Sequence, residues 1–268
     1  MSALIFTLKK DLLQKLDVSP LTPDHLSDKN ISQISATLLW YGKQQLRADD
    51  IFLIEGSDTQ DLVFEKCTAK VDYIGSGMKT GRIIVNGNAG AFLAFQMQKG
   101  ELLLNGNAAD FTACAMSGGL LQINGNVGDY LGAALIGDRK GMKGGTVIVK
   151  GDAGERTGDQ MRRGLILIEG NVGSYCGSRM LAGTIGILGN VGEYVGYGMR
   201  RGTLILTKRP SLHATIQDCG IHTLPFLNLM FKSFSQLPSK FAQINQNRAH
   251  RFAGDIANEG KGEILILE

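Results

Sequence analysis

The sequence is poor in the residues that most often carry metal or nucleophilic chemistry. Its 268 residues include four histidines and four cysteines, and none of these forms an HxH, HExxH or CxxC pattern. A strict GxGxxG and a GxxxxGK[ST] phosphate loop are also missing despite 36 glycines. No paired carboxylates and no Ser/His/Asp arrangement stand out. The sequence therefore predicts no catalytic, cofactor-binding or metal-ligating residue in this chain.

Long apolar runs and a strong net charge are absent as well. No run reaches the length that spans a membrane, and the start, Met1–Lys9, becomes charged too soon for a secretory signal. A net charge of +3 gives no general case for nucleic-acid binding. Cysteines without a framework spacing are typical of free thiols in a reducing compartment. We therefore expect a cytoplasmic protein that binds neither membrane nor nucleic acid.

What the sequence does contain is a repeat. Seven of the nine methionines lie 19 residues apart, except for one interval of 26, and a glycine follows each of them after three residues. The methionines of the repeat are Met78, Met97, Met116, Met142, Met161, Met180 and Met199. Self-similarity at a short fixed period indicates a repeat architecture. The single longer interval indicates one insertion, Ala133 to Arg139.

Each repeat holds one apolar run of four or five residues between a glycine and a Gly/Asn turn, which suits a strand and is too short for a helix. Nineteen residues can make about three short strands separated by turns. We therefore predict an all-β fold, a single-stranded parallel β-helix of about seven 19-residue rungs with small α/β caps at both ends. The expected domains are an N-terminal cap at 1–60, the repeat domain at 61–207, and a C-terminal cap with a helix and a final strand at 208–268.

The period also predicts which side chains face the interior. Strand residues such as Ile83 and Val85 form one interior row, and the methionines form a second. A third row comes from Phe92 and its equivalents or from the small residues beside them. Five residues between the inward strand positions are aliphatic although they should point outward: Ile84, Leu103, Ile148, Leu167 and Ile205. We therefore expect cover from a helix around Leu224–Leu237 or from another chain.

Charged residues keep the same period. Lysine or arginine occupies seven sites in the two positions after the methionines: Lys79, Lys99, Lys143, Arg162, Arg163, Arg200 and Arg201. A different corner carries an acidic row of Asp110, Asp129, Glu155 and Glu193. Like charges about 5 Å apart repel unless solvent or a partner compensates them. The basic row is therefore either a solvated face or a docking site for an acidic partner.

One short segment brings a possible nucleophile and a possible ligand close in sequence. Cys219 and His222 lie three residues apart, with Asp218 before them. Such proximity is weak support for a catalytic pair, and a structural role is favoured.

Several segments resemble the C-subunit family of formylmethanofuran dehydrogenase: Gly151–Gly164, Gly198–Leu204 and Asp218–His222. The opening, Met1–Leu4 and Leu16–Leu21, is most similar to the bacterial branch, the C subunit of the formyltransferase/hydrolase complex. The repeat alone also resembles the C-terminal domain of the glutamate synthase large subunit, which belongs to a far longer chain.

The resemblance implies a non-catalytic scaffold subunit of a cytosolic complex in one-carbon metabolism. Such a complex moves a formyl group between tetrahydromethanopterin and a methanofuran-type carrier and hydrolyses it to formate during formaldehyde oxidation. The expected partners are an amidohydrolase-like subunit, which would hold zinc, and a formyltransferase subunit. Because the carrier can bear a glutamate tail, the basic row is also a candidate contact for that tail.

Two alternatives remain open at this point. One is the C subunit of a molybdenum or tungsten formylmethanofuran dehydrogenase, which only the neighbouring subunits would distinguish. The other is a freestanding carbohydrate-active β-helix protein, which would need carboxylates clustered in a cleft. The sequence determines neither the stoichiometry of a complex nor the face that each partner contacts.

Overall fold

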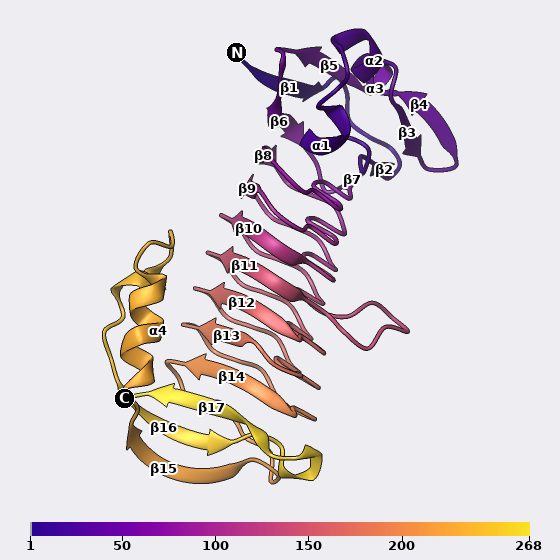
Figure 1. Ribbon diagram of the computed structural model, residues 1–268. Helices are drawn as coiled ribbons and strands as arrows, with labels where there is room; N and C mark the ends of the chain where they lie inside the picture. Colours follow the sequence, from indigo (N-terminus) through magenta and orange to yellow (C-terminus); the bar gives the residue numbers. More distant parts are fainter. Residues whose placement is uncertain (1) are drawn as a thin grey trace.

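Strands dominate the computed structural model, which describes residues 2–268 (Figure 1). The strands are β1 (Ala3–Leu8), β2 (Leu16–Asp17), β3 (Leu38–Tyr41), β4 (Gln44–Arg47), β5 (Phe52–Glu55), β6 (Asp58–Cys67), β7 (Val71–Asp72), β8 (Arg82–Gly87), β9 (Glu101–Asn105), β10 (Ser117–Ile123), β11 (Lys143–Val149), β12 (Arg163–Ile168), β13 (Thr184–Ile187), β14 (Arg201–Leu206), β15 (Gln217–Thr223), β16 (Arg248–Ala253) and β17 (Lys261–Leu267). The helices are α1 (Pro23–Leu26), α2 (Ile31–Ser35), α3 (Ala48–Ile51) and α4 (Phe226–Phe234), with 3₁₀ turns η1 (Lys240–Gln243) and η2 (Ile256–Asn258).

Most strands belong to one mixed sheet of 13 strands, in the order β15-β16-β17-β14-β13-β12-β11-β10-β9-β8-β6-β1-β5. Strands β8 to β14 pair in parallel, so equivalent residues of successive repeats lie side by side, as Ile84 does beside Leu103. Both ends of the sheet are antiparallel, where β5 pairs with β1 and where β15, β16 and β17 meet. A second sheet, β4-β3-β2-β7, lies in the N-terminal part.

The prediction of a single-stranded parallel β-helix is wrong. That prediction required about three strands from each repeat, whereas each repeat contributes one strand to a mixed sheet with antiparallel ends. The remainder of a repeat consists of turns, and alternate residues there take left-handed backbone, as at Phe92 (φ 62°), Ala94 (φ 54°) and Gln96 (φ 54°). A run with left-handed backbone at every second residue is not an extended strand. Isolated bridges, such as Ala89 to Ala108, link the repeats in this region.

The division of the chain into 1–60, 61–207 and 208–268 stays a prediction. The 13-stranded sheet takes strands from all three ranges, with β1 and β5 from the first and β15 to β17 from the last. None of the helices within residues 2–268 is long and apolar enough to cross a membrane.

The seven methionines of the repeat are fully buried, as predicted. Each methyl group lies where the glycine of the next repeat would otherwise carry a side chain. A Cβ added to Gly183 would be 3.0 Å from Cε of Met161, and one added to Gly202 would be 2.9 Å from Cε of Met180. Both glycines also have positive φ, 104° and 107°. Methionine and glycine therefore share a period because the thioether occupies the space that a larger residue would need.

The inward strand residues form the predicted interior row. All fourteen are at most 1% exposed: Ile83, Val85, Leu102, Leu104, Leu121, Ile123, Val147, Val149, Ile166, Ile168, Ile185, Ile187, Leu204 and Leu206. The third interior row consists of the residues that follow the aromatic positions: Leu93, Thr112, Leu131, Thr157, Cys176 and Val195. The aromatic rings themselves stack nearer the surface, with centroids 5.2 Å apart for Phe92 and Phe111 and 4.8 Å apart for Phe111 and Tyr130. The sequence left open whether the aromatic residues or the residues beside them form the third interior row. The residues beside them form it.

A C-terminal arm, residues 224–247, lies against the outer face of the sheet (Figure 1). Its contacts form a second apolar cluster that includes Leu167, Ile205, Leu265, Leu227, Phe231, Phe234 and Phe241. A Cβ on Gly186 would lie 2.7 Å from the ring of Phe241, so the missing side chain makes room for that ring. Glu169 ties the arm to the end of β12 by accepting a 2.8 Å hydrogen bond from the backbone N–H of Lys240. The predicted helix therefore covers this part of the outward aliphatic row.

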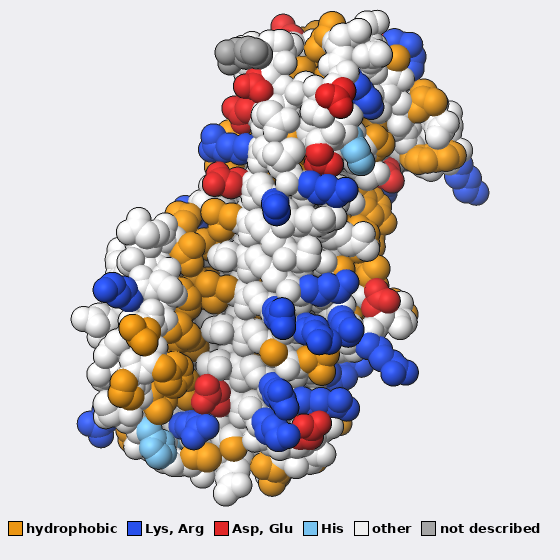
Figure 2. Space-filling model, viewed as in Figure 1, with side chains coloured by type: hydrophobic (Ala, Val, Ile, Leu, Met, Phe, Trp, Pro, Cys, Tyr) orange, Lys and Arg blue, Asp and Glu red, His pale blue; other side chains and the backbone are white. Residues whose placement is uncertain are grey.

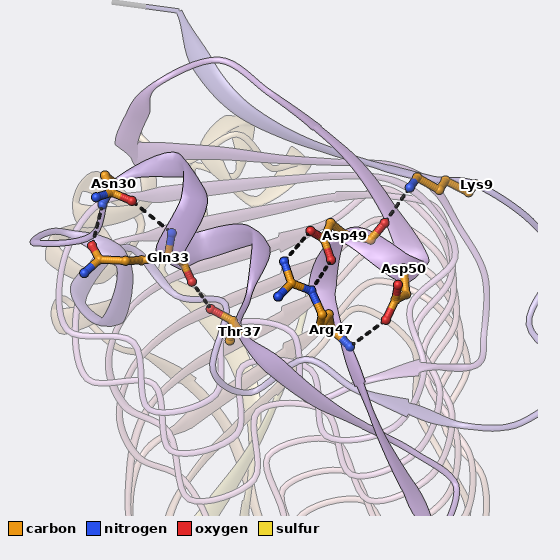
Figure 3. Close-up of polar contacts among 7 residues, drawn as sticks. All are labelled: Lys9, Asn30, Gln33, Thr37, Arg47, Asp49 and Asp50. Atoms are coloured by element: carbon orange, nitrogen blue, oxygen red, sulfur yellow. Dashed lines mark hydrogen bonds and ion pairs between the residues drawn. The ribbon is translucent and has the colours of Figure 1, made fainter.

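Polar contacts stabilise the N-terminal part of the chain (Figure 3). Asn30 is the N-cap of α2 and forms a capping box with Gln33. The side-chain oxygen of Asn30 accepts a 2.9 Å hydrogen bond from the backbone N–H of Gln33, and the side-chain oxygen of Gln33 accepts a 3.0 Å hydrogen bond from the backbone N–H of Asn30. Arg47 pairs with Asp49 through two hydrogen bonds of 2.9 and 2.7 Å. Lys9 donates to the carbonyl oxygen of Asp49, which connects α3 to the segment after β1.

Candidate functional site

Five of the seven residues predicted for docking lie together near the N-terminal ends of β11, β12 and β14. We call these five exposed residues the basic face: Lys143, Arg162, Arg163, Arg200 and Arg201. Lys143 and Arg163 are cross-strand neighbours, and Figure 2 shows lysine and arginine side chains gathered over this part of the molecule. The basic face borders two hollows of about 370 Å³ each.

Lys79 and Lys99 are exposed as well but line neither hollow. Ser117 and Gly118 take the basic positions in the repeat between Lys99 and Lys143, and Leu181 takes one between Arg163 and Arg200. The row is therefore interrupted instead of continuous along the corner. Whether any of the seven residues docks a partner stays a prediction.

An ion pair beside the basic face, in which the carboxylate is buried and the guanidinium is exposed, was not found from the sequence. The side chain of Asp159 is 3% exposed, and it accepts hydrogen bonds from Arg179 Nε at 2.9 Å and from Ser178 Oγ at 2.7 Å. A second guanidinium nitrogen of Arg179 also donates to this carboxylate. The hydrogen bond to Asp159 raises the pKa of Arg179, which keeps the guanidinium charged and fixed in place.

The insertion, Ala133 to Arg139, lies next to the ion pair of Asp159 and Arg179. Arg139 and Lys140 at its end line a hollow of about 640 Å³ together with Arg179 and Arg200. A departure from the repeat could have revealed this ion pair in the sequence. Asp159 lies two residues before Met161, and the equivalent position before Met116 is Cys114. A buried carboxylate requires a partner.

These groups can bind anions. Guanidinium and ammonium groups from several repeats face shared hollows, and arginine suits the two-pronged recognition of carboxylate or phosphate. Among residues 2–268, no group of three or more His, Cys, Asp or Glu side chains is arranged to hold a metal ion.

The acidic row has a structural use. Oδ1 of Asp110 accepts the backbone N–H of Asp129 at 2.9 Å, and Oδ1 of Asp129 accepts that of Glu155 at 2.7 Å. Asp110 and Asp129 therefore each bind the backbone of the next repeat. This single file does not form the cleft of carboxylates that the carbohydrate-active alternative needs.

Cys219 and His222 do not meet through their reactive atoms. Nε2 of His222 lies 2.7 Å from the carbonyl oxygen of Cys219, and the Cys219 sulfur lies 3.6 Å from the carbonyl oxygen of Gln217. Asp218 pairs instead with His250, whose Nε2 is 2.6 Å from Oδ1. The hydrogen bond from His250 holds the pKa of Asp218 below its usual range.

Thiol reactivity is expected to separate Cys219 from the other cysteines. Cys67, Cys114 and Cys176 are buried, and burial raises the pKa of each thiol to about 12. Because the thiolate is the reactive form, a maleimide near neutral pH should label one thiol in the native chain and four after unfolding. Intact-mass measurement checks the count, and Cys219→Ser should remove the native label. Native labelling of a second thiol would contradict the burial of the repeat cysteines.

Stacked glycine-rich repeats, a buried methionine row and an exposed basic face define a glycine-rich repeat protein. The chain belongs to the GXGXG motif family, whose sequence pattern matches residues 65–222. Its resemblance to the C subunit of formylmethanofuran dehydrogenase is confirmed by its similarity to known proteins.

Among solved structures, the chain is similar to one in the formyltransferase/hydrolase complex from Methylorubrum extorquens, determined in complex with methylofuran. The TM-score is 0.92 at 35% sequence identity, over 98% of both chains. Two curated relatives are each the C subunit of a tungsten-containing formylmethanofuran dehydrogenase 2, one from Methanococcus maripaludis strain S2 and one from Methanococcus maripaludis. They are 32% and 31% identical over 95 residues, which is 35% of this chain and 35% of each relative. The match therefore spans about a third of the length of these curated relatives.

Proposed function

We propose that this chain is a non-catalytic scaffold subunit of a formyltransferase/hydrolase complex in one-carbon metabolism. The observation that carries the proposal is the likeness over 98% of both chains to a member of such a complex. The complex would move a formyl group between tetrahydromethanopterin and a methanofuran-type carrier and hydrolyse it to formate during formaldehyde oxidation.

The partners belong to the same proposal. An amidohydrolase-like subunit would hold zinc, and a formyltransferase subunit would carry out the transfer. No residue of this chain is proposed as a zinc ligand. A cytoplasmic location fits four free thiols, which are typical of a reducing compartment.

One alternative keeps support from a specific observation. The curated relatives are subunits of tungsten-containing dehydrogenases, so an oxidoreductase complex would be the second candidate. Their likeness covers 35% of this chain, against 98% for the formyltransferase/hydrolase chain, and we therefore favour the latter. Copurification with a metal–pterin or iron–sulfur subunit would reverse that choice.

The basic face is the proposed contact for an acidic partner surface or for an acidic tail on the carrier. Reversing the charge of Arg162, Arg163, Arg200 and Arg201 to glutamate should lower recovery of partner subunits or carrier affinity by about tenfold or more. The isolated chain should keep its melting temperature, because all four side chains are exposed. Affinity purification and a carrier-binding titration measure the two effects.

Lys79→Glu/Lys99→Glu is the matched control. These two lysines occupy equivalent repeat positions but lie outside the hollows of the basic face. Their reversal should leave recovery and affinity near the wild-type values. If the fourfold variant behaves like this control, the basic face has no role in docking.

A further inference from the structure

The outer face of the sheet carries one continuous column of side chains. Cross-strand pairing places its members next to one another from the N-terminal end of the sheet toward the C-terminal end. We call them the outer column: Glu55, Ile5, Val63, Ile84, Leu103, Gln122, Ile148, Leu167, Gly186, Ile205 and Leu265.

The two halves of the outer column differ in cover. Ile148, Leu167, Ile205 and Leu265 are fully buried in the half that the arm occupies. On the other side of Gln122, the aliphatic members Ile5, Val63, Ile84 and Leu103 are only half-buried. The arm does not reach β8 or β9 (Figure 1). One apolar strip is therefore covered at one end and open at the other.

The open half has an acidic border. Asp61, Arg82 and Glu101 are cross-strand neighbours along one side of it. Glu65 lies on the other side, where its Oε1 accepts a 2.7 Å hydrogen bond from Asn86 Nδ2. With Glu55 at the end of the column, four carboxylates and one guanidinium surround the strip. Acidic and basic side chains line this edge of the molecule in Figure 2.

We propose that the open half binds an amphipathic segment of a partner subunit, apolar on one face and bordered by lysine or arginine. The inference rests on the proposed role as a subunit of a complex. The arm shows what fits this surface, because α4 covers the same column with Leu227, Phe231 and Phe234. The carboxylates around the open half would pair with basic residues at the borders of the segment.

The dimensions suit a helix. Strands β5, β1, β6, β8, β9 and β10 carry the open half, and their five steps of about 4.8 Å span about 24 Å. A helix of about 16 residues has that length. A second copy of this chain is a poor occupant, because a symmetric contact would place carboxylates against carboxylates.

The double variant Ile84→Glu/Leu103→Glu tests the apolar part of the proposal. Both side chains are already partly exposed, so the isolated chain should keep its fold, while recovery of one partner subunit should fall by about tenfold or more. Leu13→Glu/Leu229→Glu is the matched control, since these leucines are 85% and 73% exposed and lie outside the strip. Recovery equal to that of the control would overturn the proposal.

The charged border needs a test of its own. Glu65→Gln/Glu101→Gln removes two carboxylates with little change of shape and should weaken partner binding at low salt. The difference from wild type should shrink at high salt, because ionic strength screens the same attraction. Equal binding of both proteins at low salt would contradict a basic partner.

Cysteine labelling tests whether the open half is covered in the complex, and it does not depend on a variant that blocks assembly. In a Cys219→Ser background the remaining native thiols are buried, so Leu103→Cys supplies one reactive site. A maleimide should label it in the isolated chain and fail to label it in the purified complex. Equal labelling in both states would overturn the proposal even if the glutamate variants misfold.

The outcomes separate this inference from the proposed function. If the wild-type chain recovers no partner subunits, the proposed function fails. If it recovers them and Ile84→Glu/Leu103→Glu does so equally, only this inference fails. If the isolated wild-type chain is a dimer by light scattering and the variant is a monomer, the open half binds a second copy and the partner assignment is wrong.

Discussion

Met161→Lys is expected to lower the free energy of unfolding by at least about 3 kcal/mol, because it removes a buried thioether and places an ammonium group in an apolar core. Met161 has no exposed surface, and its methyl group fills the space above Gly183. Successive repeats pack against one another, so a defect in one repeat also disturbs the packing of both of its neighbours. Chemical denaturation followed by circular dichroism measures the loss.

Two controls make this result specific. Gln160→Lys puts the same side chain one residue earlier, at a half-buried position, and should cost far less. Met161→Leu keeps the volume and should cost less than about 1.5 kcal/mol. If the midpoint denaturant concentration for unfolding of Met161→Lys equals that of the wild type, the methionine row does not form the core.

Phe241→Ala is expected to detach the C-terminal arm at a cost of about 3–5 kcal/mol, the usual range for truncating a buried phenylalanine. The ring is fully buried and fills the space left by Gly186 between Leu167 and Ile205 in the outer column. Limited proteolysis should cut residues 224–247 in the variant at protease concentrations that leave the wild type intact. Cleavage sites are identified by mass spectrometry.

Phe226→Ala is the control for the arm, because its ring is 41% exposed and lies outside the buried cluster. It should leave the protease pattern unchanged. An intact arm in Phe241→Ala would mean that other contacts hold it, such as the pair between Lys240 and Glu169. The outer column would then not be what fixes the arm to the sheet.

The 19-residue period predicted which side chains are buried better than it predicted the backbone conformation of each repeat. Met161 and Ile83 could be placed in the core because a fixed register gives equivalent residues equivalent surroundings. The number of strands in each repeat could not be derived in this way. Phe92 and Ala94 have ordinary side chains, yet both take left-handed backbone that tertiary packing imposes and composition does not reveal.

The candidate site was predicted in part for the same reason. Arg162 and Arg200 keep the period, so their position on one corner followed from the repeat. Asp159 and Arg179 depart from it, and their pairing depends on contacts between repeats that no spacing rule encodes. The hollow beside the insertion could not be predicted either, because Arg139 and Lys140 lie outside the repeat pattern.

The central claim is that this chain holds a formyl-transferring complex together without performing its chemistry. The most direct measurement is purification through a tag on this chain from its native host, with mass spectrometry of the copurifying subunits and formyl-transfer assays on the complex and on the isolated chain. Our account predicts an amidohydrolase-like subunit and a formyltransferase in the complex, with activity in the complex and none in the isolated chain. Recovery of the chain by itself, or formyl transfer by the isolated chain, would contradict it.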